Sequence, residues 1–121
     1  MASNEAKFSL LEHSQAKVDL YTKYLSIYLN VLYRASGIKH IYIYDLLCGE
    51  GKYMNGSFGS SLGAVKVIKD HYLSNGNSSK DISLFLNDSE ESLIEPGKSK
   101  IQRNRELIKE FLLPENVKVH F

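Results

Sequence analysis

The sequence predicts an α/β fold built on a parallel β-sheet. Three segments with helical spacing of apolar residues alternate with three short apolar segments rich in β-branched and aromatic residues. This order of helix and strand is typical of parallel strands joined by crossover helices. The 121 residues are 43% hydrophobic and 24% charged, as expected for one ordinary globular domain.

The first helix is predicted over residues 11–35. Its apolar residues form two neighbouring stripes at spacings of three and four: Val18, Tyr21, Leu25, Tyr28 and Leu32 in one, Leu20, Tyr24, Ile27 and Val31 in the other. A face this wide predicts a helix that is buried on more than one side, or that lies between the sheet and a partner. Gly37 is a stop signal. Residues 1–10 lack such a period and are expected to be a frayed N-terminus, which leaves the domain over 11–121.

The remaining elements follow in regular order. A nearly all-apolar strand over 40–47 is typical of a sheet buried on both faces. A glycine-rich loop follows, then a helix over 62–73 with Ser60 or Ser61 as its N-cap, and a strand over 82–86. The inward residues of this helix are expected to be Ala64, Val65, Val67 and Ile68. The last helix, over 101–113, is stopped by Pro114 and followed by a strand over 117–121. Its expected buried residues are Ile101, Leu107, Ile108, Phe111 and Leu112. Since α/β folds usually continue past a third strand, we expect the N-terminal half of a larger fold.

Composition excludes several classes of protein. Cys48 is the one cysteine, so the chain is no disulfide scaffold, and neither an export signal nor a membrane helix is visible. We therefore expect a cytoplasmic protein, in which Cys48 is a small buried residue. The formal net charge of +1 does not indicate a nucleic-acid partner. The basic residues at the start of the last helix are expected to be a solvated cluster and not a phosphate-binding patch: Lys98, Lys100, Arg103 and Arg105. His40, His71 and His120 do not have the spacing of metal ligands, so no metal site is predicted.

The candidate site lies where the first two strands end. In an open parallel sheet, ligands bind beyond the carboxyl ends of the strands. The first strand ends in Asp45 and is followed by Gly49 and Gly51, which permit a tight turn and close approach of a ligand. The second strand ends before Asp88, whose carboxylate suits the two hydroxyls of a ribose.

Two kinds of nucleotide site compete for this pattern. The dinucleotide fingerprint needs a third glycine where this chain has Met54, which disfavours an NAD site. An S-adenosylmethionine site begins with an acidic residue at a strand tip and continues to G-x-G, as residues 45–51 do, with Leu47 where a glycine often stands. Glu50 and Tyr53 flank the glycines and are further candidates for ligand contact. No P-loop motif is present.

The chain resembles the three-Cys-motif partner (TcmP) family. The resemblance rests on His13-Ser14 with Lys17 in the first helix, on IYIYDLLCGEGKY, and on GSFGSSLGAVKVI. It implies a Rossmann-like three-layer fold of the class I S-adenosylmethionine-dependent methyltransferase type and association with three-Cys-motif radical-SAM proteins. The chain departs from the family at Gly59-Ser60-Ser61, where Gly-Ser-Pro is usual, and in being shorter than the family's members.

The resemblance also implies roles for individual residues. Asp45, Gly49 and Gly51 would line the methionine end of the cofactor, and Asp88 would hold its ribose. His13 and Lys17 are one helical turn apart and form a possible additional site.

The predicted function is therefore the cofactor-binding half of a methyltransferase. The acceptor nucleophile would attack the sulfonium methyl in line, and the protein would mostly position the two reactants. No catalytic residue is named, because such residues normally follow a fourth strand. One alternative is a non-catalytic module that binds the cofactor or serves a radical-SAM partner, and another is a nucleotide-binding domain of a different kind. An incomplete sheet also predicts self-association through its unpaired edge strands.

Overall fold

The computed structural model describes residues 12–75 and 80–121 of the chain. The element order is α2 (Glu12–Arg34), β1 (His40–Asp45), α3 (Ser60–Asn75), β2 (Asp81–Leu86), α4 (Lys100–Ile108), a short 3₁₀ turn η1 (Lys109–Phe111) and β3 (Val117–His120). The strands pair in parallel in the order β1-β2-β3. The predicted α/β class is thus confirmed as a small open sheet that is compatible with a Rossmann-like fragment. The frayed N-terminus predicted over 1–10 lies outside the described residues.

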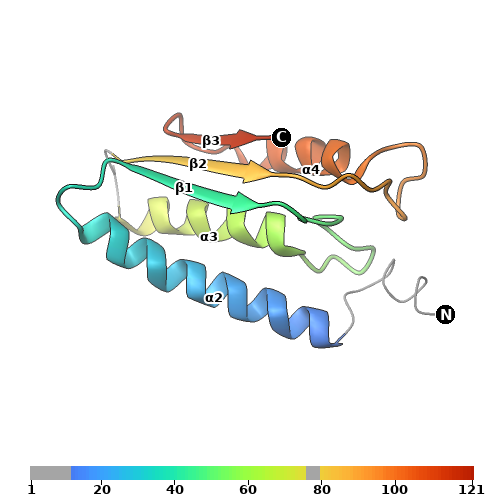
Figure 1. The fold of residues 1–121 in the computed structure, drawn as a ribbon, viewed down its shortest axis with the longest axis horizontal. Helices are drawn as coiled ribbons and strands as arrows, with labels where there is room; N and C mark the ends of the chain where they lie inside the picture. The colour runs from blue at the N-terminus through green and yellow to red at the C-terminus, as the bar shows by residue number, and fades with distance from the viewer. Residues whose placement is uncertain (1–11, 76–79) are drawn as a thin grey trace.

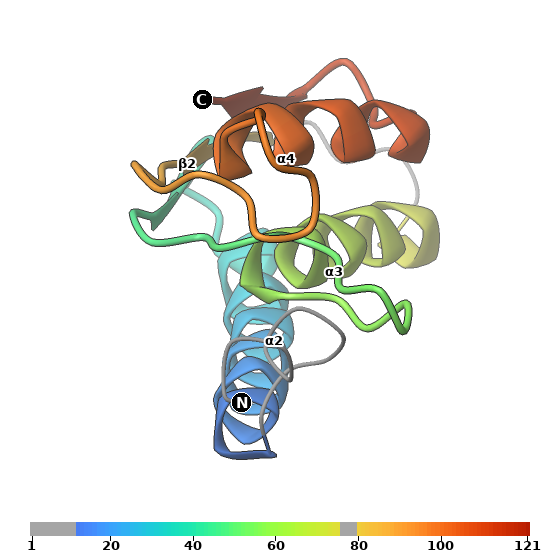
Figure 2. The same ribbon diagram turned by 90° about the vertical axis from the view of Figure 1, so that its right-hand side faces the viewer.

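The described helices lie on one side of the sheet (Figures 1 and 2). α3 and α4 cover one face, and α2 packs beside α3, below the outer edge of β1. As a consequence, one face of β1 is covered and the other is open: Ile41 is 5% exposed, whereas its neighbour Tyr42 is 57% exposed. The described chain therefore forms two layers, and the prediction that β1 is buried on both faces is wrong for these residues.

The uncovered face carries a row of aromatic rings across the three strands. Tyr44, Phe85 and His120 are register partners in β1, β2 and β3. Their ring centroids lie 4.7 Å apart for Tyr44 and Phe85 and 4.5 Å apart for Phe85 and His120. Stacked rings shield one another's faces from water, which explains why Phe85 is only partly exposed on an open face.

The core forms around α3. Ala64, Val65 and Ile68 are fully buried, as the sequence predicts, and pack against the sheet and against Leu29 of α2. Gly63 lies on the side of α3 that meets α2, where a Cβ would stand 2.7 Å from the Thr22 methyl group. Glycine at this position therefore permits the close packing of the two helices.

Two element ends differ from the prediction. β1 ends at Asp45, and Leu46 and Leu47 form an exposed turn instead of its last two residues. The last helix tightens into the 3₁₀ turn at Lys109, and Leu112, predicted to be buried, is 83% exposed with a left-handed φ of 51°. Leu112 is the left-handed C-cap that ends the turn, and Pro114 keeps Leu113 out of helical backbone, because a proline disfavours that conformation in the residue before it.

The second apolar stripe of α2 is mostly exposed. Leu25 and Leu29 are buried against α3, but Leu20, Ile27 and Val31 of the second stripe are each more than half exposed. Of the two alternatives predicted for α2, burial on more than one side is therefore wrong for the described chain, and a position between the sheet and a partner stays a prediction. None of its helices has the length and apolar character needed to cross a membrane.

His71 of α3 is buried against Tyr33 of α2, with ring centroids 4.2 Å apart. Burial lowers the pKa of His71, because a buried imidazolium loses its hydration. The unfolded chain therefore binds a proton more readily than the native chain at pH values below the ordinary histidine pKa of about 6.5.

We expect this histidine to make the fold less stable as pH falls. The free energy of unfolding of the wild type should decrease between pH 7.5 and 5.5, with the loss beginning near the ordinary pKa of about 6.5, since protonation favours the unfolded chain. His71→Phe should flatten this part of the profile. Urea unfolding at a series of pH values measures both, and equal slopes for the two proteins would contradict the prediction.

Candidate functional site

The carboxyl ends of β1 and β2 are joined by main-chain hydrogen bonds beyond the strands themselves. Asn87 N–H donates to the Asp45 carbonyl at 2.9 Å, and Cys48 N–H donates to the Asn87 carbonyl at 3.0 Å. These bonds continue the ladder into the loops that follow the strands. They bring Gly49 and Asp88 together, although the two are far apart in the sequence.

Asp88 links the two loops directly. One carboxylate oxygen accepts the Gly49 N–H at 3.0 Å, and the other accepts the Glu90 N–H at 2.9 Å. The side chain is buried, with the residue 9% exposed. Each carboxylate oxygen has a second lone pair, so Asp88 retains acceptor capacity while it holds Gly49 in place.

Asp45 faces the start of α3. Its carboxylate is half-buried and accepts the Ser60 hydroxyl at 2.5 Å. Ser60 is the first residue of α3, so the predicted choice of Ser60 or Ser61 as a cap preceding the helix is wrong by one or two residues. A carboxylate near a helix N-terminus is stabilised by the helix dipole.

Tyr21 of α2 lies close enough to Asp45 for its charge to matter. Burial, and secondly the Asp45 carboxylate, raise the pKa of Tyr21 to about 12. The phenolic oxygen is buried and makes no hydrogen bond within the described residues. Tyr21 is therefore a neutral hydrogen-bond donor beside the carboxyl end of β1. Its helical spacing predicted only that it packs in the first apolar stripe of the helix.

The two glycines of the loop differ in their surroundings. Gly49 has φ of 69° and faces open space apart from the Tyr53 hydroxyl, which a Cβ would meet at 3.8 Å. Gly51 has φ of 83°, is buried, and has no room for a Cβ because the Asn104 side chain occupies that space. Gly49 thus remains a candidate for ligand contact, whereas Gly51 packs against α4.

Tyr53 is half-buried beside the loop. Burial raises the pKa of its hydroxyl, and the negative charges of Glu50 and Asp88 act in the same direction. Tyr53 therefore remains protonated near neutral pH and can only donate or accept as a neutral phenol.

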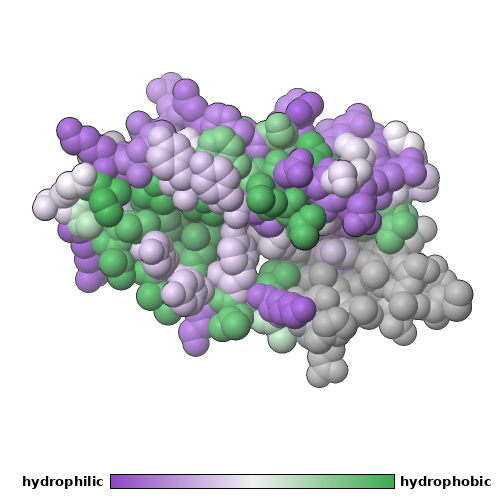
Figure 3. Space-filling model, in the orientation of Figure 1, coloured by the Kyte–Doolittle hydropathy of each residue, from purple (hydrophilic) through white to green (hydrophobic). Residues whose placement is uncertain are grey.

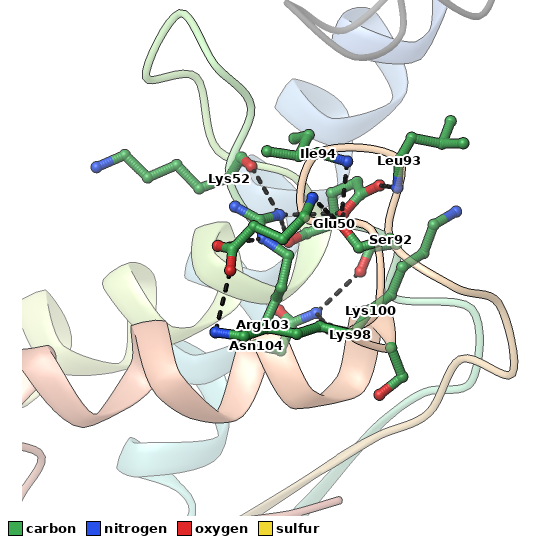
Figure 4. A network of polar contacts seen from close by, with 12 residues as sticks. Glu50, Lys52, Ser92, Leu93, Ile94, Lys98, Lys100, Arg103 and Asn104 are labelled. Carbon is green, nitrogen blue, oxygen red and sulfur yellow. Dashed lines mark hydrogen bonds and ion pairs between the residues drawn. The ribbon is translucent and has the colours of Figure 1, made fainter.

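The Glu50 side chain is directed toward Arg103 and Ser92 in an interior ion pair (Figure 4). It is 3% exposed, and one carboxylate oxygen receives Arg103 Nη1 at 3.0 Å and the Ser92 hydroxyl at 2.7 Å. The other oxygen accepts the Leu93 N–H at 2.7 Å. This full set of donors shows that Glu50 holds the loop to the interior.

Arg103 and Asn104 of α4 fasten the glycine loop from behind. Arg103 Nη1 also donates to the carbonyls of Glu50 and Lys52, at 3.0 and 3.2 Å. Asn104, which is fully buried, donates to the Gly49 carbonyl at 2.8 Å and contacts the Ser61 hydroxyl. The two residues therefore fix the backbone of residues 49–52.

Sequence reasoning missed both of these residues. It assigned Arg103 to a solvated basic cluster at the helix start, which is wrong because Arg103 is 6% exposed. The burial of Asn104 could have been predicted from its spacing. It stands three residues after Ile101 and four before Ile108, and so lies on the apolar face of the helix.

Cys48 packs beneath the same loop and is 2% exposed. Burial, then the carboxylates of Asp45 and Asp88, raise its pKa to about 12. The thiol therefore stays protonated at neutral pH, in agreement with the prediction of a small buried residue.

A cavity of about 290 Å³ opens beside the strand tips, on the uncovered face of the sheet. Its walls are mostly aromatic and apolar, from Tyr44, Leu46, Phe85, Leu86, Asn87, His120 and Phe121. A flat, partly apolar group suits such walls, and Asn87 offers an amide for hydrogen bonding. The described residues contain no cluster of His, Cys, Asp and Glu side chains that could hold a metal ion.

The predicted additional site on α2 is only partly described. Lys17 is exposed, and no contact in the described part of the chain joins it to Asp45 or Asp88. His13 belongs to α2, but its side chain is outside the described part. A separate cavity of about 500 Å³ between α2, α3 and the loop 56–58 is lined by Gln15, Val18 and Asp19 on another face of the helix.

Removing the Arg103 charge should strongly destabilise the fold. Arg103→Met leaves Glu50 buried without its cation, and loss of one partner of a buried pair costs about 3–5 kcal/mol of unfolding free energy. Lys66→Met is the matched control, since it breaks an ion pair with Asp70 whose side chains are each 59% exposed, and should change stability by less than about 0.5 kcal/mol. Denaturant unfolding compares the two, and equal effects would contradict the role of Arg103.

Comparisons with known proteins add no family assignment. Nothing matches this chain among protein-family models, curated proteins or solved structures. The interpretation of the site therefore rests on its own geometry and on the motifs quoted above.

Proposed function

We propose that the chain binds S-adenosylmethionine at the carboxyl ends of β1 and β2, as the cofactor-binding part of a class I methyltransferase-like protein. The observation that carries the proposal is the hydrogen bond from Gly49 N–H to Asp88. It joins a glycine loop after one strand to a carboxylate after the next. A nucleotide ligand needs both groups, one for close approach to the backbone and one for the ribose.

The residues at this edge offer groups suited to each part of the cofactor. Asp88 has acceptor lone pairs for ribose hydroxyls. Asp45 supplies negative charge, and Gly49 lacks a side chain toward the methionine end. The aromatic cavity beside Tyr44 and Phe85 suits the adenine ring. When bound, the cofactor supplies an activated methyl group, and these residues would hold and orient it.

The backbone after the glycines favours this cofactor over a dinucleotide. In the dinucleotide fingerprint, the glycine-rich turn leads directly into the helix whose N-terminus binds the pyrophosphate. Here the residues after Gly51 form a small excursion, closed by an antiparallel bridge between Lys52 and Phe58, before α3 begins at Ser60. The α3 N-terminus already receives Asp45 through Ser60.

The two motifs that resemble the TcmP family, over residues 41–53 and 56–68, support a TcmP-like role next to a radical-SAM protein. Methyl transfer itself requires residues that orient an acceptor, and none is assigned among the described residues. A module that only binds the cofactor or a partner uses the same site without that requirement.

We expect S-adenosylhomocysteine and S-adenosylmethionine to stabilise the protein and NAD to have no effect. A ligand at about 100 times its dissociation constant adds about 2.7 kcal/mol of stability to the native state. Thermal unfolding with each compound measures this gain. Asp45→Asn should remove most of it by removing the charge at the first strand tip.

Asp81→Asn is the matched control, because Asp81 is an exposed carboxylate at the opposite end of the sheet. It should keep the full stabilisation by both adenosyl compounds. Absence of stabilisation in the wild type, or an equal loss in both variants, would overturn the proposed site.

A further inference from the structure

A smaller cavity, the α3–η1 cavity, has a volume of about 230 Å³ and lies apart from the strand tips. Its walls come from α3, from α4 with η1, and from the loop that precedes α3. Among the described residues, none that line it belongs to a strand. Whether the sheet has further strands therefore does not decide whether this cavity is open. Figure 3 shows that hydrophobic surface also gathers over the sheet, but that surface is no part of the cavity.

The apolar walls of the cavity belong to the edge of the core. Leu62 is 1% exposed, and Leu107 is partly buried against the core. The rings of Phe58 and Phe111 meet edge to face, with centroids 6.1 Å apart and planes at 61°. Aromatic rings prefer such edge-to-face and offset-stacked contacts, so these walls favour a further aromatic ring.

The volume limits the size of the occupant. Pockets for drug-sized ligands have volumes of roughly 300–1,000 Å³, and the α3–η1 cavity lies below this range. It therefore suits a molecule with a single ring and a short side chain.

Two ammonium groups face this cavity on a fixed frame. Lys69 Nζ donates to the Phe111 carbonyl at 2.6 Å, which leaves two of its three N–H donors for a ligand. The Lys52 backbone is held by Arg103, which donates to its carbonyl at 3.2 Å, and by the bridge to Phe58. Figure 4 shows the Lys52 side chain extended away from the Glu50–Arg103 pair. Neither lysine forms an ion pair with another residue of the ranges 12–75 and 80–121.

The charge balance of the cavity favours a monoanion. Glu110 is the carboxylate among the lining residues, and it is exposed. Two ammonium groups against one carboxylate leave one positive charge to balance. A carboxylate group brings one negative charge, whereas a phosphate monoester brings about 1.5 to 2 at neutral pH and would exceed the balance.

We propose that the α3–η1 cavity binds a small aromatic carboxylate. The ring lies against Phe58, Phe111 and Leu107, and the carboxylate accepts hydrogen bonds from the ammonium groups of Lys52 and Lys69. A mostly apolar hollow with a few convergent polar groups is the usual form of a small-molecule site. This binding does not depend on the proposed cofactor.

The test compares three compounds that share a phenyl ring and a three-carbon chain: 3-phenylpropionate, 3-phenylpropan-1-ol and 3-phenylpropylamine. Titration of the full chain, followed by NMR of its backbone amides, should give a dissociation constant for the carboxylate that is about fivefold lower than for the alcohol. The amides of Phe58, Leu107 and Phe111 should shift most. Absence of binding, equal binding of the three, tighter binding of the amine, or shifts confined to other residues overturns the proposal.

A pair of lysine variants tests the role of charge at this position. Lys52→Met removes an exposed ammonium but keeps an apolar chain, and should raise the dissociation constant of 3-phenylpropionate about threefold while leaving that of the alcohol unchanged. Lys66→Met is the matched control, because Lys66 is an exposed lysine of α3 that does not line the cavity. It should leave both constants unchanged. No loss in Lys52→Met, or an equal loss in both variants, overturns the assigned site.

Discussion

The buried pair of Glu50 and Arg103 is the interaction on which the site depends. Removing two charges from water costs several kcal/mol for each ion, and the cost is offset only when further hydrogen bonds satisfy the remaining donors and acceptors. Here Ser92, Leu93 and two loop carbonyls complete the set. The pair therefore joins the loop after β1, the loop after β2 and α4 into one unit.

This unit explains how so small a sheet presents a defined carboxyl edge. Asp88 and Gly49 meet because the two loops are held from behind, and Gly51 has no side chain because Asn104 needs its space. A ligand at this edge would contact a backbone already ordered by interior contacts. The affinity gained from such preorganisation does not require a rigid ligand.

Periodicity was sufficient to predict the order of elements, because each helix and strand buries a face with its own repeat. The buried residues of α3 were therefore correct, and Asp45 and Asp88 were placed at the same sheet edge. Periodicity could not show which apolar face is covered, so the second face of β1 was wrongly expected to be buried, and the outer stripe of α2 is exposed in the described chain. It also could not distinguish a buried Arg103 from a solvated one, since the difference depends on Glu50, which is distant in the sequence. Leu112 was misplaced because the helical period does not reveal that the chain leaves the helix there, in the left-handed conformation of a C-cap.

The close contact between Gly63 and Thr22 has a consequence for how fast a partner could associate. Because α3 holds α2 at a fixed separation and angle, the outer face of α2 exists before any encounter. Association then carries no ordering entropy for this helix. Its rate is governed by mutual orientation of the two surfaces, as for other preformed interfaces, and differences in affinity among partners would arise mainly in their dissociation rates.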